Sequence, residues 1–149
     1  MHTLDILRLE KKFLHWGHDI TSENNPFESG LAFAVNFKKN ENFIGRKALE
    51  KIKDKPLKKR LELFSLKNKF RPGAPLMLHD EPIFKDNKIV GYTTSSNFSF
   101  YYKKNICLAY IKGNIRDKED LFVEIEGKKY PLNLEKIPLH DPSSKLMRS

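Results

Sequence analysis

The chain has little that would suit secretion or insertion into a membrane. Its 149 residues include one cysteine, Cys107, which excludes an intramolecular disulfide and suits a reducing compartment. The longest apolar runs are a few residues, far short of the roughly 20 needed to cross a bilayer. Asp5 and Glu10 follow closely on the first apolar residues, an order that signal peptides do not have. We therefore expect a cytoplasmic protein without a membrane partner.

The sequence also lacks the local motifs of common enzyme classes. It has neither a Gly-rich phosphate loop nor a GxGxxG fingerprint, which excludes a P-loop and a Rossmann-type flavin or NAD site. The histidines are scattered, and His15 and His18 straddle Gly17 without an acidic or cysteine cluster to complete a metal site. No elbow motif supports a Ser-His-Asp triad. Local patterns therefore nominate no catalytic residue and no metal ligand.

Apolar and aromatic residues are frequent enough to build a core. A hydrophobic content of 39%, with eleven Phe and five Tyr, indicates one globular domain or a small domain with an appendage. The net charge of +9 permits an anionic partner, including nucleic acid. The densest basic stretch, residues 51–60, falls where a helix should end, a position that favours cations. A solvated surface explains the charge better than a nucleic-acid patch, which remains an alternative.

Glu10 is the most conspicuous residue of a helix predicted over residues 3–13. At 100° per residue the helix carries two apolar arcs, and Glu10 projects between them while Arg8 points roughly opposite. The arcs consist of Ile6, Leu9 and Phe13 on one side and Leu4 and Leu7 on the other. A buried carboxylate needs a partner because burying it alone is costly. Periodicity leaves open whether the partner is a protein cation or a ligand with paired N–H donors.

Two further elements are expected before residue 60. Alternation of Phe33, Val35 and Phe37 predicts a strand over residues 33–37. A second helix is predicted over residues 43–53, supported by an i, i+4 pair of Arg46 and Glu50 and ended by Pro56.

From about residue 60 the pattern changes to short strands separated by turn residues. Turns are expected at 86–88 and 127–128, and residues 70–75 read as a loop. The strands are expected at 61–66, 82–85, 89–95, 106–111, 122–126 and 129–134. Such a series favours a small antiparallel barrel or sandwich, so the fold class is α+β. Cys107 lies within one of these strands and is interpreted as buried packing.

Several segments together resemble the folate-binding aminomethyltransferase family. This family includes the glycine cleavage T-protein and the C-terminal region of dimethylglycine and sarcosine dehydrogenases. The matching segments near the N-terminus are Leu7-Arg8-Leu9-Glu10, Trp16-Gly17-His18-Asp19, residues 25–31 and residues 42–49. Residues 88–95, 104–111 and 130–139 look like the C-terminal β-barrel of the family. Trp16-Gly17-His18, where T-proteins commonly have Tyr-Gly-Asn, favours the dehydrogenase branch.

The resemblance implies a cofactor, tetrahydrofolate, and three cofactor-binding residues. In the family the residue that matches Glu10 binds the pterin ring, whose 2-amino group and neighbouring N–H form a donor pair that suits a carboxylate. Trp16 matches an aromatic residue near the ligand, and a role in the core is an equal alternative. Lys39 lies close to a family arginine that contacts folate, and lysine keeps the charge but lacks the planar fork.

The resemblance also implies that much of an active enzyme lies outside this sequence. The preceding half of the folate domain, its catalytic aspartate and the flavin domain that binds FAD in the dehydrogenases have no counterpart here. We expect residues 1–59 to close a folate-binding domain, residues 60–140 to form the barrel and residues 141–149 to form a flexible tail. The expected function is the C-terminal portion of an enzyme that transfers a one-carbon unit to tetrahydrofolate, inactive alone. The alternatives are a subunit of a split enzyme and a non-enzymatic binding protein that keeps the barrel.

Overall fold

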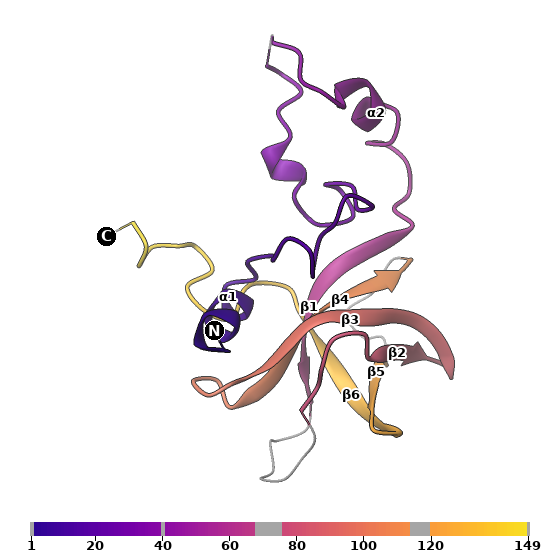
Figure 1. Ribbon diagram of the computed structural model, residues 1–149, viewed down its shortest axis with the longest axis vertical. Helices are drawn as coiled ribbons and strands as arrows, with labels where there is room; N and C mark the ends of the chain where they lie inside the picture. The colour runs from indigo at the N-terminus through magenta and orange to yellow at the C-terminus, as the bar shows by residue number, and fades with distance from the viewer. Residues whose placement is uncertain (1, 40, 68–75, 114–119, 149) are drawn as a thin grey trace.

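A six-stranded antiparallel β-barrel forms the body of the molecule (Figure 1). The computed structural model describes residues 2–39, 41–67, 76–113 and 120–148. The elements in chain order are α1 (His2–Glu10), the 3-10 helix η1 (Ala32–Ala34), α2 (Arg46–Glu50), β1 (Lys59–Leu66), β2 (Pro82–Lys85), β3 (Lys88–Ser99), β4 (Lys104–Lys112), β5 (Phe122–Ile125) and β6 (Lys128–Glu135). Helix α1 packs against β3 and β4.

The barrel closes in the order β1-β4-β3-β2-β5-β6, and neighbouring strands pair antiparallel throughout this order. Tight turns join β2 to β3 and β5 to β6, where Asp86, Asn87, Glu126 and Gly127 all have positive φ angles. Positive φ at both central positions suits the twist of a hairpin. The structure therefore confirms the expected strands and the α+β class. The loop expected at 70–75 lies outside the described residues.

Strand β4 shows why the run from Ile106 to Ile111 is apolar throughout. Successive side chains of a strand point to opposite faces, so Cys107, Ala109 and Ile111 enter the barrel core while Ile106 and Leu108 lie outside it. The outer residues are covered by Leu9 of α1, which is completely buried. Both faces of β4 are therefore buried, and α1 serves as the cover for the second face.

A close approach of two strands depends on a glycine. Gly91 of β3 pairs with Ile111 of β4, and a Cβ atom at Gly91 would lie 2.1 Å from the carbonyl oxygen of Tyr110. No side chain fits at that distance, so only glycine permits this register.

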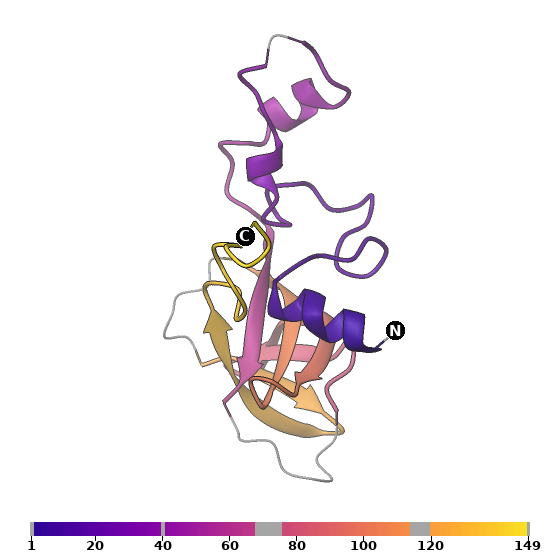
Figure 2. The same ribbon diagram turned by 90° about the vertical axis from the view of Figure 1, so that its left-hand side faces the viewer.

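Residues 30–58 leave the barrel as a long excursion, drawn at the top of both views (Figures 1 and 2). Among its described residues none is buried, and Phe33 is 86% exposed. We call this segment the excursion. Its few internal contacts include Arg46, which donates hydrogen bonds to the carbonyl oxygens of Phe37 and Lys39 and to the carboxylate of Glu50.

Three predictions in the N-terminal part need correction. The strand expected at 33–37 is absent, and residues 32–34 form η1, because no neighbouring strand is present to pair with this edge. The second helix spans only Arg46–Glu50 instead of 43–53, although the Arg46–Glu50 pair is confirmed at 3.0 Å. Helix α1 ends at Glu10 instead of residue 13, because Lys12 adopts φ of 55°, which terminates the helix.

In the part of the chain that the structure describes, no helix is long and apolar enough to cross a membrane.

Candidate functional site

Glu10 lies at the C-terminal end of α1, between the helix and the far end of β3. Glu10 is only 4% exposed. The hydroxyl of Ser99, the last residue of β3, donates a hydrogen bond of 2.5 Å to Oε1 of Glu10. The backbone of Glu10 is also fixed, because the N–H of His140 donates to its carbonyl oxygen at 3.0 Å. The burial that the sequence pattern predicted for this carboxylate is therefore present.

The cations next to Glu10 in the sequence are engaged elsewhere. Lys11 forms an ion pair with Asp141 at 3.1 Å, and Lys12 forms one with Glu62 at 3.1 Å. The hydroxyl of Ser99 donates to Oε1 of the Glu10 carboxylate. Burying a carboxylate is costly unless cations or hydrogen-bond donors compensate it. Neither of these two neighbouring lysines compensates Glu10, and its carboxylate has acceptor capacity beyond the bond from Ser99.

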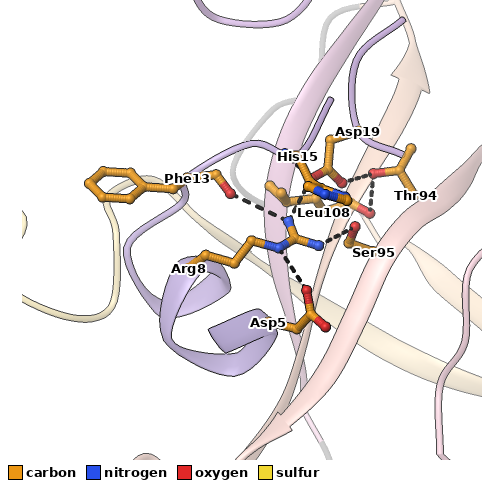
Figure 3. A network of polar contacts seen from close by, with 8 residues as sticks. All are labelled: Asp5, Arg8, Phe13, His15, Asp19, Thr94, Ser95 and Leu108. Carbon is orange, nitrogen blue, oxygen red and sulfur yellow. Dashed lines mark hydrogen bonds and ion pairs between the residues drawn. The ribbon is translucent and has the colours of Figure 1, made fainter. Parts of the chain in front are cut away.

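Arg8 is held in a network of polar contacts that ties α1 to the barrel (Figure 3). Its Nη1 donates to Oδ2 of Asp19 at 2.6 Å, and its Nη2 donates to Oγ of Ser95 at 2.8 Å. Asp19, which is 1% exposed, also accepts the backbone N–H of His15 at 2.8 Å and the hydroxyl of Thr94 at 2.6 Å. Arg8 and Asp19 are therefore a buried ion pair in which both side chains have further hydrogen-bond partners.

An irregularity in β3 explains how two consecutive hydroxyls reach this network. The register of β3 against β4 shifts between Thr93 and Ser95, so that Thr94 is an extra residue. Such a bulge interrupts strict alternation and re-aims side chains. As a result both Thr94 and Ser95 contact the Arg8–Asp19 pair, while Thr93 donates to the carbonyl oxygen of Leu78.

An aromatic residue and a histidine support the Glu10 end of the helix. The backbone N–H of Tyr102 donates to Oγ of Ser99 at 3.1 Å, and the Tyr102 hydroxyl lies 3.3 Å from Nδ1 of His140. Burial raises the pKa of Tyr102, and the nearby Tyr101 and the charge of Glu10 raise it further. Tyr102 therefore remains a neutral hydrogen-bonding group at neutral pH, and Ser99 is oriented from two sides.

The structure does not connect Glu10 with the other two predicted cofactor-binding residues through any described contact. Trp16 is 67% exposed, and its backbone forms an isolated bridge with Ile20. Lys39 forms an exposed ion pair with Glu41 at 3.5 Å. Their roles toward a ligand stay predictions.

Sequence reasoning missed the residues that position Glu10. Arg8, Asp19, Thr94 and Ser95 all lie inside the motifs that carried the family resemblance, yet no role was assigned to them. Their presence in those motifs was the available signal. In the described ranges no three His, Cys, Asp or Glu side chains gather as a metal site.

Comparison with known proteins matches two parts of the chain to family models. Residues 59–141 match the model of the glycine cleavage T-protein C-terminal barrel domain, and residues 1–39 match the GCVT N-terminal domain. Human mitochondrial dimethylglycine dehydrogenase is 35% identical over 93% of this chain and 16% of its own length. The aminomethyltransferase of Synechococcus elongatus is 34% identical over 91% of this chain and 36% of its own length.

A solved structure agrees on the fold. The aminomethyltransferase T of the glycine cleavage system from Bartonella henselae superposes with a TM-score of 0.80 and 22% identity. The match covers 93% of this chain and 38% of that protein. The chain thus spans about a third of the aminomethyltransferases and a sixth of the dehydrogenase that it matches. With its barrel matched from end to end, the chain belongs to the glycine cleavage T-protein C-terminal barrel family.

Proposed function

We propose that this chain is the C-terminal part of a tetrahydrofolate-dependent one-carbon transferase, in which Glu10 binds the pterin ring. The observation that carries the proposal is the state of Glu10: it is buried, Ser99 donates to its Oε1, and the neighbouring Lys11 and Lys12 pair with other carboxylates. A ligand with paired N–H donors would compensate the cost of burying this carboxylate.

The remaining acceptor capacity of Glu10 suits such a ligand. Each carboxylate oxygen has two lone pairs, so Oε1 can accept from Ser99 and still share a coplanar donor pair with Oε2. The pterin 2-amino group and the neighbouring ring N–H present this pair. When bound, tetrahydrofolate supplies the nitrogen atoms that accept the one-carbon unit. The chain itself binds and orients: Ser99 fixes the carboxylate, and the Arg8–Asp19 network fixes the helix that carries it.

The substrate class is proposed from the relatives. Those named dimethylglycine dehydrogenase and 4-methylaminobutanoate oxidase bear the names of N-methylated amino acids, and others are named aminomethyltransferase. An N-methylated or aminomethyl amine is therefore the proposed one-carbon donor of the complete enzyme. The chain spans 36% of the aminomethyltransferase it matches, so we propose that it needs the rest of a folate domain for turnover. We keep residues 1–59 and 60–140 as the proposed division between that domain and the barrel.

A binding measurement on the completed assembly tests the proposal. This chain is combined with the remainder of an aminomethyltransferase folate domain, and tetrahydrofolate affinity is measured by calorimetry for the wild type and Glu10→Gln. A hydrogen bond to a charged group contributes about 1.5–3 kcal/mol, so Glu10→Gln should weaken binding by roughly 10- to 100-fold. The control is Glu126→Gln in the exposed β5–β6 turn, which should leave the affinity unchanged. Equal affinity of Glu10→Gln and wild type would contradict the role of Glu10, and absence of folate binding would favour a barrel without folate chemistry.

A further inference from the structure

The chain that follows β6 returns to the C-terminal end of α1, the end that carries Glu10 (Figure 1). We call residues 138–145 the strap. Leu139 packs against the cluster under α1, and the backbone N–H of His140 donates to the carbonyl oxygen of Glu10 at 3.0 Å. The strap is therefore hydrogen-bonded to the backbone of the residue that we propose binds the ligand.

Lys11, the residue after Glu10, contacts the strap through its side chain. Its Nζ donates to the carbonyl oxygen of Asp141 at 2.8 Å and to Oδ2 of the same residue at 3.1 Å, and it lies 3.4 Å from Oγ of Ser144. Only 11% of the Lys11 side chain and 6% of the Asp141 side chain are exposed. We call these contacts of Lys11 the clamp. Two consecutive residues, Glu10 and Lys11, are thus bonded to two consecutive residues of the strap.

A turn within the strap orients Asp141 toward Lys11. The backbone N–H of Ser144 donates to the carbonyl oxygen of Asp141 at 2.9 Å, and that of Lys145 donates to Oδ1 of Asp141 at 2.8 Å. One carboxylate oxygen of Asp141 therefore accepts from the strap itself, while the other accepts from Lys11. A side chain that is already held by its own turn loses less conformational entropy when it binds a cation. The turn thus favours formation of the clamp.

Tyr102 links the strap to the side-chain support of Glu10. Its hydroxyl lies 3.3 Å from Nδ1 of His140, and its backbone N–H donates to Oγ of Ser99. Ser99 in turn donates to Oε1 of Glu10. The strap therefore reaches Glu10 by two routes, one through its backbone and one through the side chains of Tyr102 and Ser99.

We propose that the strap is a positioning element, which holds the end of α1 so that the Glu10 carboxylate faces the paired N–H donors of a pterin. This inference rests on the proposed function, because the orientation of Glu10 matters to a ligand only if Glu10 binds one. A coplanar donor pair requires both carboxylate oxygens in set directions, and an acceptor held in place loses less entropy on binding. Helix ends fray readily, so loosening the clamp should weaken binding without removing a group that contacts the ligand. Lys11 and Asp141 are thus positioning residues.

Tetrahydrofolate affinity of Lys11→Met tests the positioning role, in the assembly that completes the folate domain. Methionine keeps an apolar stem but removes the donors of the clamp. Calorimetry should show binding weakened by about tenfold, as for a misplaced binding group. Lys11→Arg keeps a cation for Asp141 and should restore most of the affinity. The control Lys129→Met removes the exposed hydrogen bond from Lys129 to Asn87 and should leave the affinity unchanged.

A double-variant cycle separates positioning from direct contact between Lys11 and the ligand. Asp141→Asn should also weaken tetrahydrofolate binding, although Asp141 acts only through Lys11. If both residues act through the clamp, the double variant Lys11→Met/Asp141→Asn should bind no more weakly than the weaker single variant. Additive losses would show that Lys11 contacts the ligand itself and would overturn the proposal.

Amide hydrogen exchange of the full-length chain gives a readout without folate. In Lys11→Met the N–H of His140 should exchange about tenfold faster, because its bond to Glu10 opens locally when the clamp is lost. The N–H of Leu108 in β4 should exchange as in the wild type. Unchanged exchange at His140, or unchanged folate affinity of Lys11→Met beside a loss for Glu10→Gln, would overturn the strap and leave the proposed function standing. Absence of tetrahydrofolate binding by the wild-type assembly would contradict the proposed function and, with it, the role of the strap.

Discussion

The barrel and the excursion contain similar apolar residues but place them in opposite environments. Phe64 of β1 is completely buried in the barrel core, and Phe33 of the excursion is 86% exposed. The barrel pairs the backbone N–H and C=O groups of its strands by closing on itself, which removes free strand edges. The excursion has only short helices and a few side-chain contacts. The difference shows that buried side chains of the barrel stabilise this chain, whereas the excursion contributes mainly exposed surface.

Two thiols should show the largest contrast between the regions. Burial raises the pKa of Cys107 far above its usual value, so the thiol stays protonated and inaccessible until the barrel opens. The native Cys107 should therefore react with a maleimide at least about a thousandfold more slowly than the thiol of Phe33→Cys in the free chain. Stopped-flow labelling at pH 7 measures both rates. Similar rates would show that the barrel opens readily, and in guanidinium the two thiols should become equivalent.

Truncating one phenylalanine in each region should sharpen the contrast in stability. Phe64→Ala removes a ring from the barrel core and should lower the free energy of unfolding by about 3–5 kcal/mol. Phe33→Ala removes an exposed ring and should change it by less than about 0.5 kcal/mol. Urea denaturation followed by circular dichroism provides the comparison. A loss at Phe33 as large as that at Phe64 would mean that the excursion has a core of its own.

Two ion pairs allow the same comparison for charge. Asp19→Ala should cost about 3 kcal/mol, because it leaves the largely buried Arg8 without its main partner. Glu50→Ala breaks the more exposed Arg46–Glu50 pair of the excursion and should cost less than about 1 kcal/mol. The same denaturation experiment measures both. Equal costs would contradict the assignment of the Arg8–Asp19 network as the link between α1 and the barrel.

The smallest effect on stability is expected at the ion pair between Asp141 and Lys11, the residue that follows α1, and this effect depends on pH. Partial burial would raise the pKa of Asp141, but hydrogen bonds from Lys11 and from the backbone of Lys145 and Leu146, with the charge of Lys11, outweigh it and lower the pKa. Because the pKa of Asp141 is lower in the folded state than in the unfolded state, its ionised carboxylate stabilises the fold at pH above the unfolded-state pKa. This stabilisation is lost as the pH falls through the folded-state pKa. Carbon-13 NMR titration of Asp141 should show the lowered pKa, and Lys11→Met should return it toward normal. An unchanged titration in Lys11→Met would contradict this origin.

Much of the barrel could be predicted because its information is local. Alternation of side chains, turn residues at 86–88 and 127–128 and the continuous apolar run of β4 are read within a few residues. The Arg46–Glu50 pair also follows from a spacing of four on a helix. The strand expected at 33–37 was wrong because alternation describes one strand, whereas a strand forms only with a partner at its edge.

The sequence by itself determined the barrel, the family and the buried position of Glu10, since periodicity and motif order are properties of neighbouring residues. Tertiary structure alone decided which partners the charged groups take. Arg8 meets Ser95 across 87 positions, Lys11 meets Asp141 across 130 and Glu10 meets Ser99 across 89. Which partner Glu10 takes depends on long-range pairing of this kind, because a charge distant in sequence leaves no periodic trace.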